Sequence, residues 1–351
     1  MRWAAGTIVF ALACGTAGTI SNTSGDGGTG AIVPADAGPA DAGPADAGPP
    51  PDCAGLIPSK IGAAYTFDVH DTSCAAATSD GTGMIVARGS KNTDGTFTWY
   101  VFSGSNGAAA GNFKAGDALY PQPTGYEGYS SSWDTYWDTY GVQRNFAIVE
   151  PGAIVDRAYG SGTIAVGASG STIVVHKVDA TGNESTTRCT AAVAGTPLDG
   201  AEDASGAVLA VVGVNGVAKG IWCDMTHGTA GAPFDIGPAT AASARALIGG
   251  GIAVGLDGHW SALLTPGDAT LHPAPAWLRD GADFAFVRGA KAYALIQSGH
   301  NAIDIVSAQG SACGAVTFGG VNSVSVGADG TVIGASGSTG CTKVFWQGAL
   351  K

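Results

Sequence analysis

A glycine-led repeat of 40–44 residues runs through most of this 351-residue chain. In each repeat, a Gly or Ala precedes a short apolar run, a turn and a second apolar run. The residues that follow the leading Gly or Ala are Met84, Thr163, Ala207, Gly251, Lys291 and Thr331. Their spacings are 79, 44, 44, 40 and 40 residues, so the first interval holds two periods and predicts a seventh repeat near residue 123. Self-similarity at such a period indicates a repeat architecture.

Each repeat also has the pattern of antiparallel hairpins. Three dipeptides favour two-residue hairpin turns: Asp94-Gly95, Asn215-Gly216 and Asp257-Gly258. The strand after the turn carries a tryptophan in four repeats: Trp99, Trp222, Trp260 and Trp346. A four-stranded unit of this length, repeated around an axis, resembles the blade of a β-propeller. The resemblance covers residues 53–351 and implies an all-β fold of seven blades, each of four antiparallel strands. A coiled parallel β-solenoid is the alternative, although its rungs are shorter than this repeat.

The last repeat has room for only three strands, at residues 321–326, 331–335 and 341–347, before the chain ends. Residues 65–69 resemble residues 233–236 and 316–318, which stand at the outer-strand position of their own repeats. We therefore expect an amino-terminal strand to complete the last blade, because closing the ring removes its exposed edges.

The composition agrees with many short strands. The chain has 57 Gly and 16 Pro, yet 45% of its residues are hydrophobic, which excludes a fully disordered chain. The glycines have no three-residue period, which excludes collagen. The net charge of −12 argues against a nucleic-acid partner or binding to an anionic membrane surface, since either requires Lys and Arg.

The amino end reads as an export signal followed by a spacer. One basic residue, Arg2, precedes an apolar run that is too short to cross a bilayer, and residues 1–14 end in Ala-Leu-Ala-Cys. This ending resembles the lipobox of bacterial lipoproteins, which implies acylation of Cys14 and anchoring to the membrane through that lipid only. Here the Leu lies two positions before the Cys, whereas the family prefers three, and the same residues also fit ordinary signal-peptide cleavage.

Residues 15–52 form a disordered linker rich in Pro, Ala, Asp and Gly, with three copies of PADAG, ahead of the domain at 53–351. Such tethers resemble those of surface lipoproteins in Gram-negative bacteria. We expect an exported protein, anchored to the outer membrane or displayed at the cell surface, or otherwise secreted or periplasmic.

Six cysteines follow Cys14, and an even number in an exported chain predicts disulfides. Of the possible pairings we expect those between sequence neighbours: Cys53–Cys74, Cys189–Cys223 and Cys313–Cys341. Zinc is the alternative, but there is no Cys-x₂-Cys and no His at ligand spacing, so we expect no metal and no cofactor.

The repeat is interrupted between about residues 104 and 146 by a stretch rich in aromatic and acidic residues. Aromatic rings beside carboxylates suit a sugar-binding platform, since rings stack on CH faces and carboxylates accept hydroxyl hydrogen bonds. The competing interpretation is a degenerate blade whose large side chains fill its own core. The candidate binding residues are Tyr126, Glu127, Tyr129, Trp133, Asp134, Tyr136, Trp137, Asp138 and Tyr140.

Other motifs give weaker indications. Residues 92–99 resemble the Asp-box of sialidase-type propellers at Asp94, Thr98 and Trp99, a box that forms a structural turn in that family. An acidic stretch, residues 199–203, and the Asp-rich segment at 68–71 do not match calcium loops, so we expect solvated turns. His259 and His300 follow turn glycines in neighbouring repeats and are weak candidates for a shared metal.

These observations predict a monomeric binding module of the cell envelope or surface that recognises a glycan or protein through one propeller face. We expect it not to be an enzyme. The alternative is an exported polysaccharide hydrolase or lyase, with two carboxylates, or a carboxylate and a His, at the mouth of the central channel. A purely structural role in the envelope is a third possibility.

Overall fold

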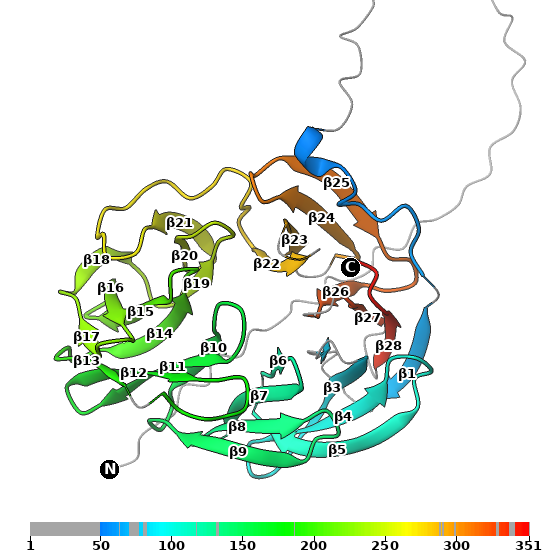
Figure 1. Cartoon of the computed structure of the whole chain (residues 1–351), viewed down its shortest axis with the longest axis horizontal. Coiled ribbons are helices and arrows are strands. Elements are labelled where there is room, and N and C mark those ends of the chain that lie inside the picture. Colours follow the sequence, from blue (N-terminus) through cyan, green and yellow to red (C-terminus); the bar gives the residue numbers. More distant parts are fainter. Residues whose placement is uncertain are drawn as a thin grey trace, which may run out of the picture.

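Seven antiparallel sheets stand around a common axis (Figure 1). The computed structural model describes residues 50–350 except 63, 70–76, 80–82, 117, 131–132, 186, 288, 290, 298–299, 328–329 and 337–340. For residues 67–69, 77–79, 130, 341 and 342 it describes the backbone only. The fold is therefore the predicted all-β, seven-bladed propeller, and we number its blades in chain order.

Blades 1 to 6 are each a run of consecutive strands that begins at the axis and ends at the rim, and blade 7 takes its rim strand from the amino end. Blade 1 contains β2 (Ala77–Ser79), β3 (Met84–Lys91), β4 (Phe97–Ser103) and β5 (Ala109–Ala115), and blade 2 contains β6 (Tyr120–Gln122), β7 (Gly125–Ser130), β8 (Trp133–Asp138) and β9 (Gln143–Ile148). Blade 3 contains β10 (Ile154–Arg157), β11 (Thr163–Ser169), β12 (Thr172–Val178) and β13 (Cys189–Ala191), and blade 4 contains β14 (Thr196–Glu202), β15 (Ala207–Val214), β16 (Val217–Asp224), β17 (Thr229–Ala230) and β18 (Phe234–Pro238). Blade 5 contains β19 (Ala242–Ala246), β20 (Ile252–Leu256) and β21 (His259–Leu264), and blade 6 contains β22 (Ala282–Val287), β23 (Ala292–Gln297), β24 (Ala302–Ser307) and β25 (Ala312–Thr317). Blade 7 contains β26 (Ser323–Val326), β27 (Val332–Ser336), β28 (Cys341–Trp346) and, from the amino end, β1 (Tyr65–Val69).

The ring closes as the sequence predicts. Strand β1 pairs antiparallel with β28, with Tyr65 opposite Phe345 and Val69 opposite Cys341. In Figure 1 the first strand lies beside the last, although the two are far apart along the chain. The pairing supplies the fourth strand of blade 7 and covers the edge of β28.

The repeat anchors mark the second strand of each blade. Strands β3, β11, β15, β20, β23 and β27 begin at an anchor or one residue after it, and β7 begins at Gly125, close to the predicted seventh repeat. Positive φ at Asn215 (52°) and Asp257 (47°), each followed by a glycine that also has positive φ, produces two of the predicted tight hairpin turns.

Blades 4 and 5 depart from the four-stranded pattern. Strand β16 pairs with both short segments β17 and β18, so the outer strand of blade 4 is broken in two. Blade 5 has three strands, and beyond β21 only the bridge between Leu263 and His272 continues its sheet. Pro266, Pro273 and Pro275 lie in the segment that would form its outer strand and have no N–H to donate to a ladder.

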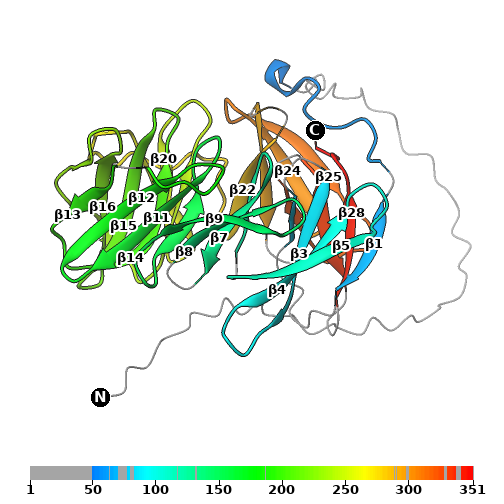
Figure 2. The same ribbon diagram turned by 60° about the horizontal axis from the view of Figure 1, so that its bottom comes forward.

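The core lies between the blades, and Figure 2 shows neighbouring blades packed face to face. Each of the seven blade interfaces contains its own cluster of buried apolar side chains. The third-strand tryptophans join neighbouring blades, because the indole N–H of Trp99 donates to Gly116 O and that of Trp260 to Ala282 O. Among the described residues, no helix has the length and apolar character needed to cross a bilayer.

Two disulfides are described, and one of them differs from the expected pairing. Cys189 bonds Cys223, as predicted. Cys53 bonds Cys313 across 260 residues of sequence, so the expected bonds Cys53–Cys74 and Cys313–Cys341 are wrong. The reason is ring closure, which brings the amino end beside blade 6. Cys74 and Cys14 lie outside the described residues, as do residues 1–49.

Candidate functional site

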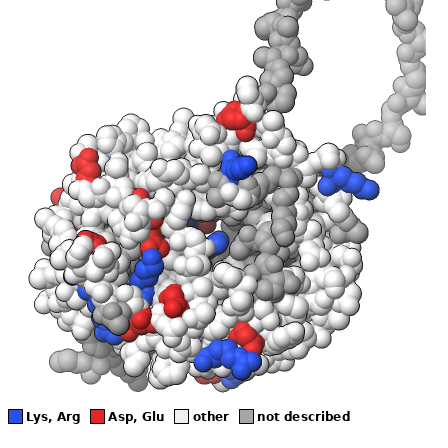
Figure 3. All heavy atoms as spheres, in the orientation of Figure 1, with Lys and Arg blue, Asp and Glu red and all other residues white. Residues whose placement is uncertain are grey.

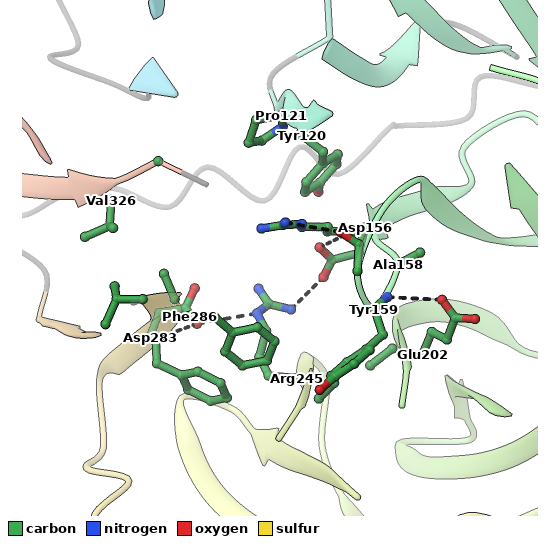
Figure 4. A pocket seen from close by; sticks show the side chains of 18 of the residues that line it. Tyr120, Pro121, Asp156, Ala158, Tyr159, Glu202, Arg245, Asp283, Phe286 and Val326 are labelled. Carbon is green, nitrogen blue, oxygen red and sulfur yellow. Dashed lines mark hydrogen bonds and ion pairs between the residues drawn. The ribbon is translucent and has the colours of Figure 1, made fainter. Parts of the chain in front are cut away.

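A cavity of about 840 Å³ lies on the axis of the ring. Its walls come mainly from the first strands of the blades, β6, β10, β14, β19, β22 and β26, because these strands face the axis. Figure 4 shows charged groups and aromatic rings around this space, together with the smaller apolar side chains Pro121, Ala158 and Val326.

Arg245 on β19 is the centre of the charged group. Its Nη1 lies 2.6 Å from Asp156 Oδ2 on β10 and 3.2 Å from Asp199 Oδ2 on β14. Its Nε lies 3.4 Å from Asp283 Oδ1 on β22. One guanidinium thus connects four consecutive blades, and Asp283, with a side chain 59% exposed, is the most accessible of the three carboxylates.

Burial and mutual charge shift the titration of this group. Burial raises the pKa of Asp199 to about 7, against the opposing effect of Arg245. Burial also raises the pKa of Asp156, again opposed by Arg245. The charge of Asp156 raises the pKa of Arg245 well above its ordinary value, so the guanidinium stays charged. Three carboxylates surround this one cation, and the nearby Arg157 supplies one further positive charge.

The aromatic part of the cavity consists of Tyr120, Tyr159, Phe284 and Phe286. The Tyr120 hydroxyl donates to Val155 O at 2.7 Å, which fixes its ring beside β10. The rings of Tyr159 and Phe286 meet edge to face, with centroids 5.9 Å apart. These contacts hold the rings in place before any ligand arrives.

Glu202 supports the aromatic wall from behind. Its Oε2 accepts the backbone N–H of Tyr159 at 3.1 Å, and its other oxygen is bonded to Lys177. The acidic stretch 199–203 is therefore not the solvated turn that we expected, because Asp199, Glu202 and Asp203 are all buried. Asp199 and Glu202 hold cavity residues in position, and Asp203 caps the turn that leads into β15.

The nine residues predicted to form a sugar platform all lie in blade 2, on β7, β8 and the turn after β8. The segment is thus a regular four-stranded blade and not an interruption of the repeat. Its aromatic rings do not share one surface. Tyr126, Tyr136 and Trp137 are buried, Tyr129 is half-buried, and Trp133 and Tyr140 are exposed. The buried rings pack against neighbouring side chains, as Trp137 does against Phe113 of blade 1 with centroids 5.1 Å apart, so as placed they offer no face to a sugar.

The acidic members of this set are also separated. Asp138 is partly buried and forms an ion pair with Arg144 at 2.6 Å. Glu127 and Asp134 are fully buried between blades 2 and 3, where Asp134 Oδ2 accepts the hydroxyl of Thr163. Among the described residues, neither oxygen of Glu127 has a hydrogen-bond partner of good geometry, nor has Asp134 Oδ1. These two carboxyls are therefore buried components of a blade interface, inaccessible to a ligand.

Two weaker motifs also have definite places. Asp94 caps the turn between β3 and β4 by accepting the backbone N–H of Thr96 at 3.0 Å, so the Asp-box-like segment is a structural turn, as in the family that it resembles. His259 forms an ion pair with Asp280 at 2.8 Å. Within the described part of the chain, no group of three or more His, Cys, Asp or Glu side chains is arranged to hold a metal ion.

Sequence reasoning named the central channel only for the alternative function and assigned no residues to it, although a signal for those residues exists. Asp156, Asp199, Arg245 and Asp283 each stand six to eight residues before a repeat anchor, in four consecutive repeats. A charged side chain on the first strand of several blades faces the axis and therefore belongs to a shared site. Figure 3 shows why such groups are informative, since most of this face carries no charged side chain.

Comparison with solved structures identifies the class of protein as a β-propeller. The β-propeller domain of Cps50 (Swd1) from Myceliophteria thermophila matches with a TM-score of 0.51 and 13% identity, over 82% of this chain and 99% of that one. The WD40 domain of coronin from Toxoplasma gondii matches with a TM-score of 0.50 and 9% identity, over 83% and 88%. No protein-family model and no curated protein matches the sequence. At these identities the likeness shows the fold alone.

Proposed function

We propose that this propeller is an exported binding module that holds the end of a neutral glycan in its central cavity. The observation that carries the proposal is the composition of the cavity wall, where four aromatic rings lie near an Arg–Asp network inside about 840 Å³. A pocket of this size that combines apolar and polar groups is the usual form of a small-ligand site.

The two kinds of side chain suit the two kinds of sugar surface. The rings of Tyr159 and Phe286 offer faces and edges to the CH groups of a pyranose. Asp283 and the Arg245 guanidinium accept and donate hydrogen bonds to hydroxyls. Arg245 is already paired with three carboxyl groups, so its guanidinium is not left free for the carboxylate of a uronic or sialic acid. The site therefore favours neutral sugars over acidic ones.

Two features support an exported location. Disulfides persist in oxidising compartments and are rare in the cytosol, and this chain contains Cys53–Cys313 and Cys189–Cys223. The signal-like amino end and the Pro-rich linker lead to the ring at residue 50. We propose anchoring through a lipid on Cys14, and mass spectrometry of the mature amino terminus tests it. A mature chain without an acylated Cys14 would reject the anchor but not the export.

Calorimetric titration of the full-length chain with neutral hexose oligosaccharides, chosen from a glycan array, tests the ligand. Hexuronic acid oligosaccharides of the same length are the matched ligands, and we expect them to bind more weakly. Phe286→Ala should weaken binding about tenfold, since it removes one ring of the wall. Trp133→Ala, which removes one exposed ring of blade 2 and none from the cavity wall, should leave binding unchanged. The reverse order of effects would move the site from the cavity to blade 2.

A hydrolase or lyase is the second candidate, because three carboxylates approach the cavity and burial raises the pKa of two of them. All three lie within 3.4 Å of Arg245, which holds them as ion-pair partners. Mass spectrometry of the same oligosaccharides after long incubation separates the two functions. Shortened or unsaturated products would establish catalysis, and intact sugars would support a binding module.

A further inference from the structure

The rim of blade 2 carries an unusual concentration of exposed apolar side chains. Among the described residues, six large apolar side chains are exposed, and five of them lie between residues 133 and 148. Three belong to one continuous surface, which we call the β9 patch: Trp133, Phe146 and Ile148, exposed by 39%, 42% and 61%. Trp133 stands opposite Ile148 in the β8–β9 ladder, and the rings of Trp133 and Phe146 lie 4.1 Å apart.

The patch borders a free strand edge. Strand β9 is the last strand of its sheet and pairs only with β8 among the described strands. The backbone N–H of Phe146 donates to the side chain of its own neighbour, Asn145, at 2.9 Å. This amide is therefore outside the β8–β9 ladder and faces the rim. The Asn145 side chain that bonds this amide also donates to Thr181 O and Asn183 Oδ1 of blade 3. An outward amide at a strand edge is a template for another strand, and a strand that pairs here replaces the local bond to Asn145.

Four other rim strands are protected in ways that β9 is not. β13 and β17 contain three and two residues, and short edges offer little to pair with. β25 is tied to the amino end by the Cys53–Cys313 bond. β5 is long, but its exposed residues are small or polar, and they include Lys114. A long rim strand with exposed aromatic and aliphatic side chains is characteristic of an interface.

We propose that β9 pairs antiparallel with β9 of a second copy of this chain, about a two-fold axis that passes beside Phe146. In an antiparallel pair, residues whose amides point toward the partner strand exchange two backbone hydrogen bonds with the opposite residue. Phe146 has such an amide, so it stands opposite Phe146 of the second copy. Arg144 then stands opposite Ile148 of the second copy, and Ile148 stands opposite Arg144 of the second copy.

The charges around the patch permit a second copy to approach. Arg144 is the one charged residue of β9, and its guanidinium lies 2.6 Å from Asp138 Oδ2 of the same blade. The patch is thus locally neutral, although the whole chain has a net charge of −12. A neutral, self-complementary edge fits the two-fold dimer, the commonest closed assembly of identical chains. Such pairing would join two blades into one sheet and cover Phe146 and Ile148.

Sedimentation velocity of the full-length chain over a range of concentrations tests the dimer. We expect reversible dimerisation, and Phe146→Asp should weaken it by about 30-fold or more, since it places two like charges opposite each other at the axis. Leu271→Asp is the matched control, because Leu271 is 43% exposed and lies away from blade 2. It should not change the dissociation constant.

A complementation experiment makes the register itself testable. Phe146→Asp and Phe146→Lys should each be monomeric alone but form a mixed dimer when combined, because position 146 faces itself. Circular dichroism and an intact Cys189–Cys223 bond establish that both variants are folded. A wild-type chain that stays monomeric at every concentration would overturn the proposal. So would a dimer that persists in Phe146→Asp, or folded variants that fail to combine.

Discussion

Replacing Glu127 by Gln should make the free energy of unfolding fall less steeply as the pH rises from 5 to 9. Glu127 is 0% exposed at the interface of blades 2 and 3, where the apolar cluster is small and buried polar side chains occupy part of the contact. Burial and, second to it, the charge of Asp134 raise the pKa of Glu127 to about 9, although Gly182 and Thr163 lie close enough to oppose part of the rise. Burial also raises the pKa of Asp134, to about 6.

The sign follows from proton linkage. The pKa of Glu127 is about 9 in the folded chain and 4.5 without the fold, so between these values the folded state binds the extra proton. The free energy of unfolding therefore falls as the pH rises through this window, by up to about 1.4 kcal/mol per pH unit. Over the whole window the free energy of unfolding can fall by at most about 6 kcal/mol, and about 3 kcal/mol of this is already lost at pH 7. Gln carries no titrating proton, so it does not show this loss.

Urea unfolding of wild type and Glu127→Gln from pH 5 to pH 9, with the disulfides intact, measures the difference. The amide of Gln changes the free energy of unfolding by an amount that does not depend on pH. The comparison is therefore between the slopes of the free energy of unfolding against pH, not between values at one pH. The free energy of unfolding of wild type should decline more steeply, by about 1 kcal/mol per pH unit.

Asp138→Asn is the matched control in the same blade. Burial alone would raise the pKa of Asp138, but hydrogen bonds from Val142, Arg144 and Tyr140 outweigh it and lower the pKa. The stability that Asp138 contributes is therefore lost only in acid, and this variant should run parallel to wild type from pH 5 to pH 9. Parallel curves for wild type and Glu127→Gln would refute the reasoning about the buried carboxyl.

Three further predictions concern stability. Changing Cys189 and Cys223 together to Ser should lower the free energy of unfolding by about 4 kcal/mol, because the bond closes a loop of 34 residues and restricts the unfolded chain. Urea unfolding measures the loss, and an unchanged midpoint would contradict the prediction. Asp94→Asn should destabilise the protein at neutral pH but not near pH 2, because hydrogen bonds from Thr96, above all from its side chain, lower the pKa of Asp94 to about 2. Thermal melts at neutral and acid pH would show whether the difference in melting temperature between wild type and variant disappears in acid. Gly162→Ala should lower the free energy of unfolding by about 1–3 kcal/mol, because Gly162 has a φ of +84° and a Cβ there would lie 2.2 Å from a carbonyl oxygen of β12. A variant that melts at the wild-type temperature would argue against this strain.

The architecture could be predicted from sequence because its strongest determinants are local. Tight turns require glycine or residues that tolerate positive φ, and these recur once per blade, so spacing alone gives the number of blades. Ring closure by residues 65–69 was predictable as well, because the last repeat lacks a strand and an open edge is unfavourable. Blade 2 was harder to recognise, since Tyr126 and Glu127 occupy positions on β7 where other blades have aliphatic residues.

The errors come from contacts that closure creates. Pairing Cys53 with its sequence neighbour assumes that near residues in the chain are near in space, whereas the ring brings residue 53 beside residue 313. The central cavity has the same origin, since Asp156, Arg245 and Asp283 come from three different blades and meet only at the axis. Aromatic content in one segment predicted a surface site, but a blade with two packed faces also buries aromatic rings.

The bond between Cys53 and Cys313 also determines how the ring bears mechanical load. A pull on the chain ahead of residue 53 enters the fold at the short helical turn Pro51–Cys53 and passes through the disulfide into β25 of blade 6. The segment that leads on to β1 lies beyond this clamp and carries little tension. Without the bond, the same pull would reach β1 from its end and peel five residues from β28 one pair at a time. The disulfide thus separates the chain ahead of residue 53 from the strand that locks the ring, so that a pull on that end of the chain does not open the propeller.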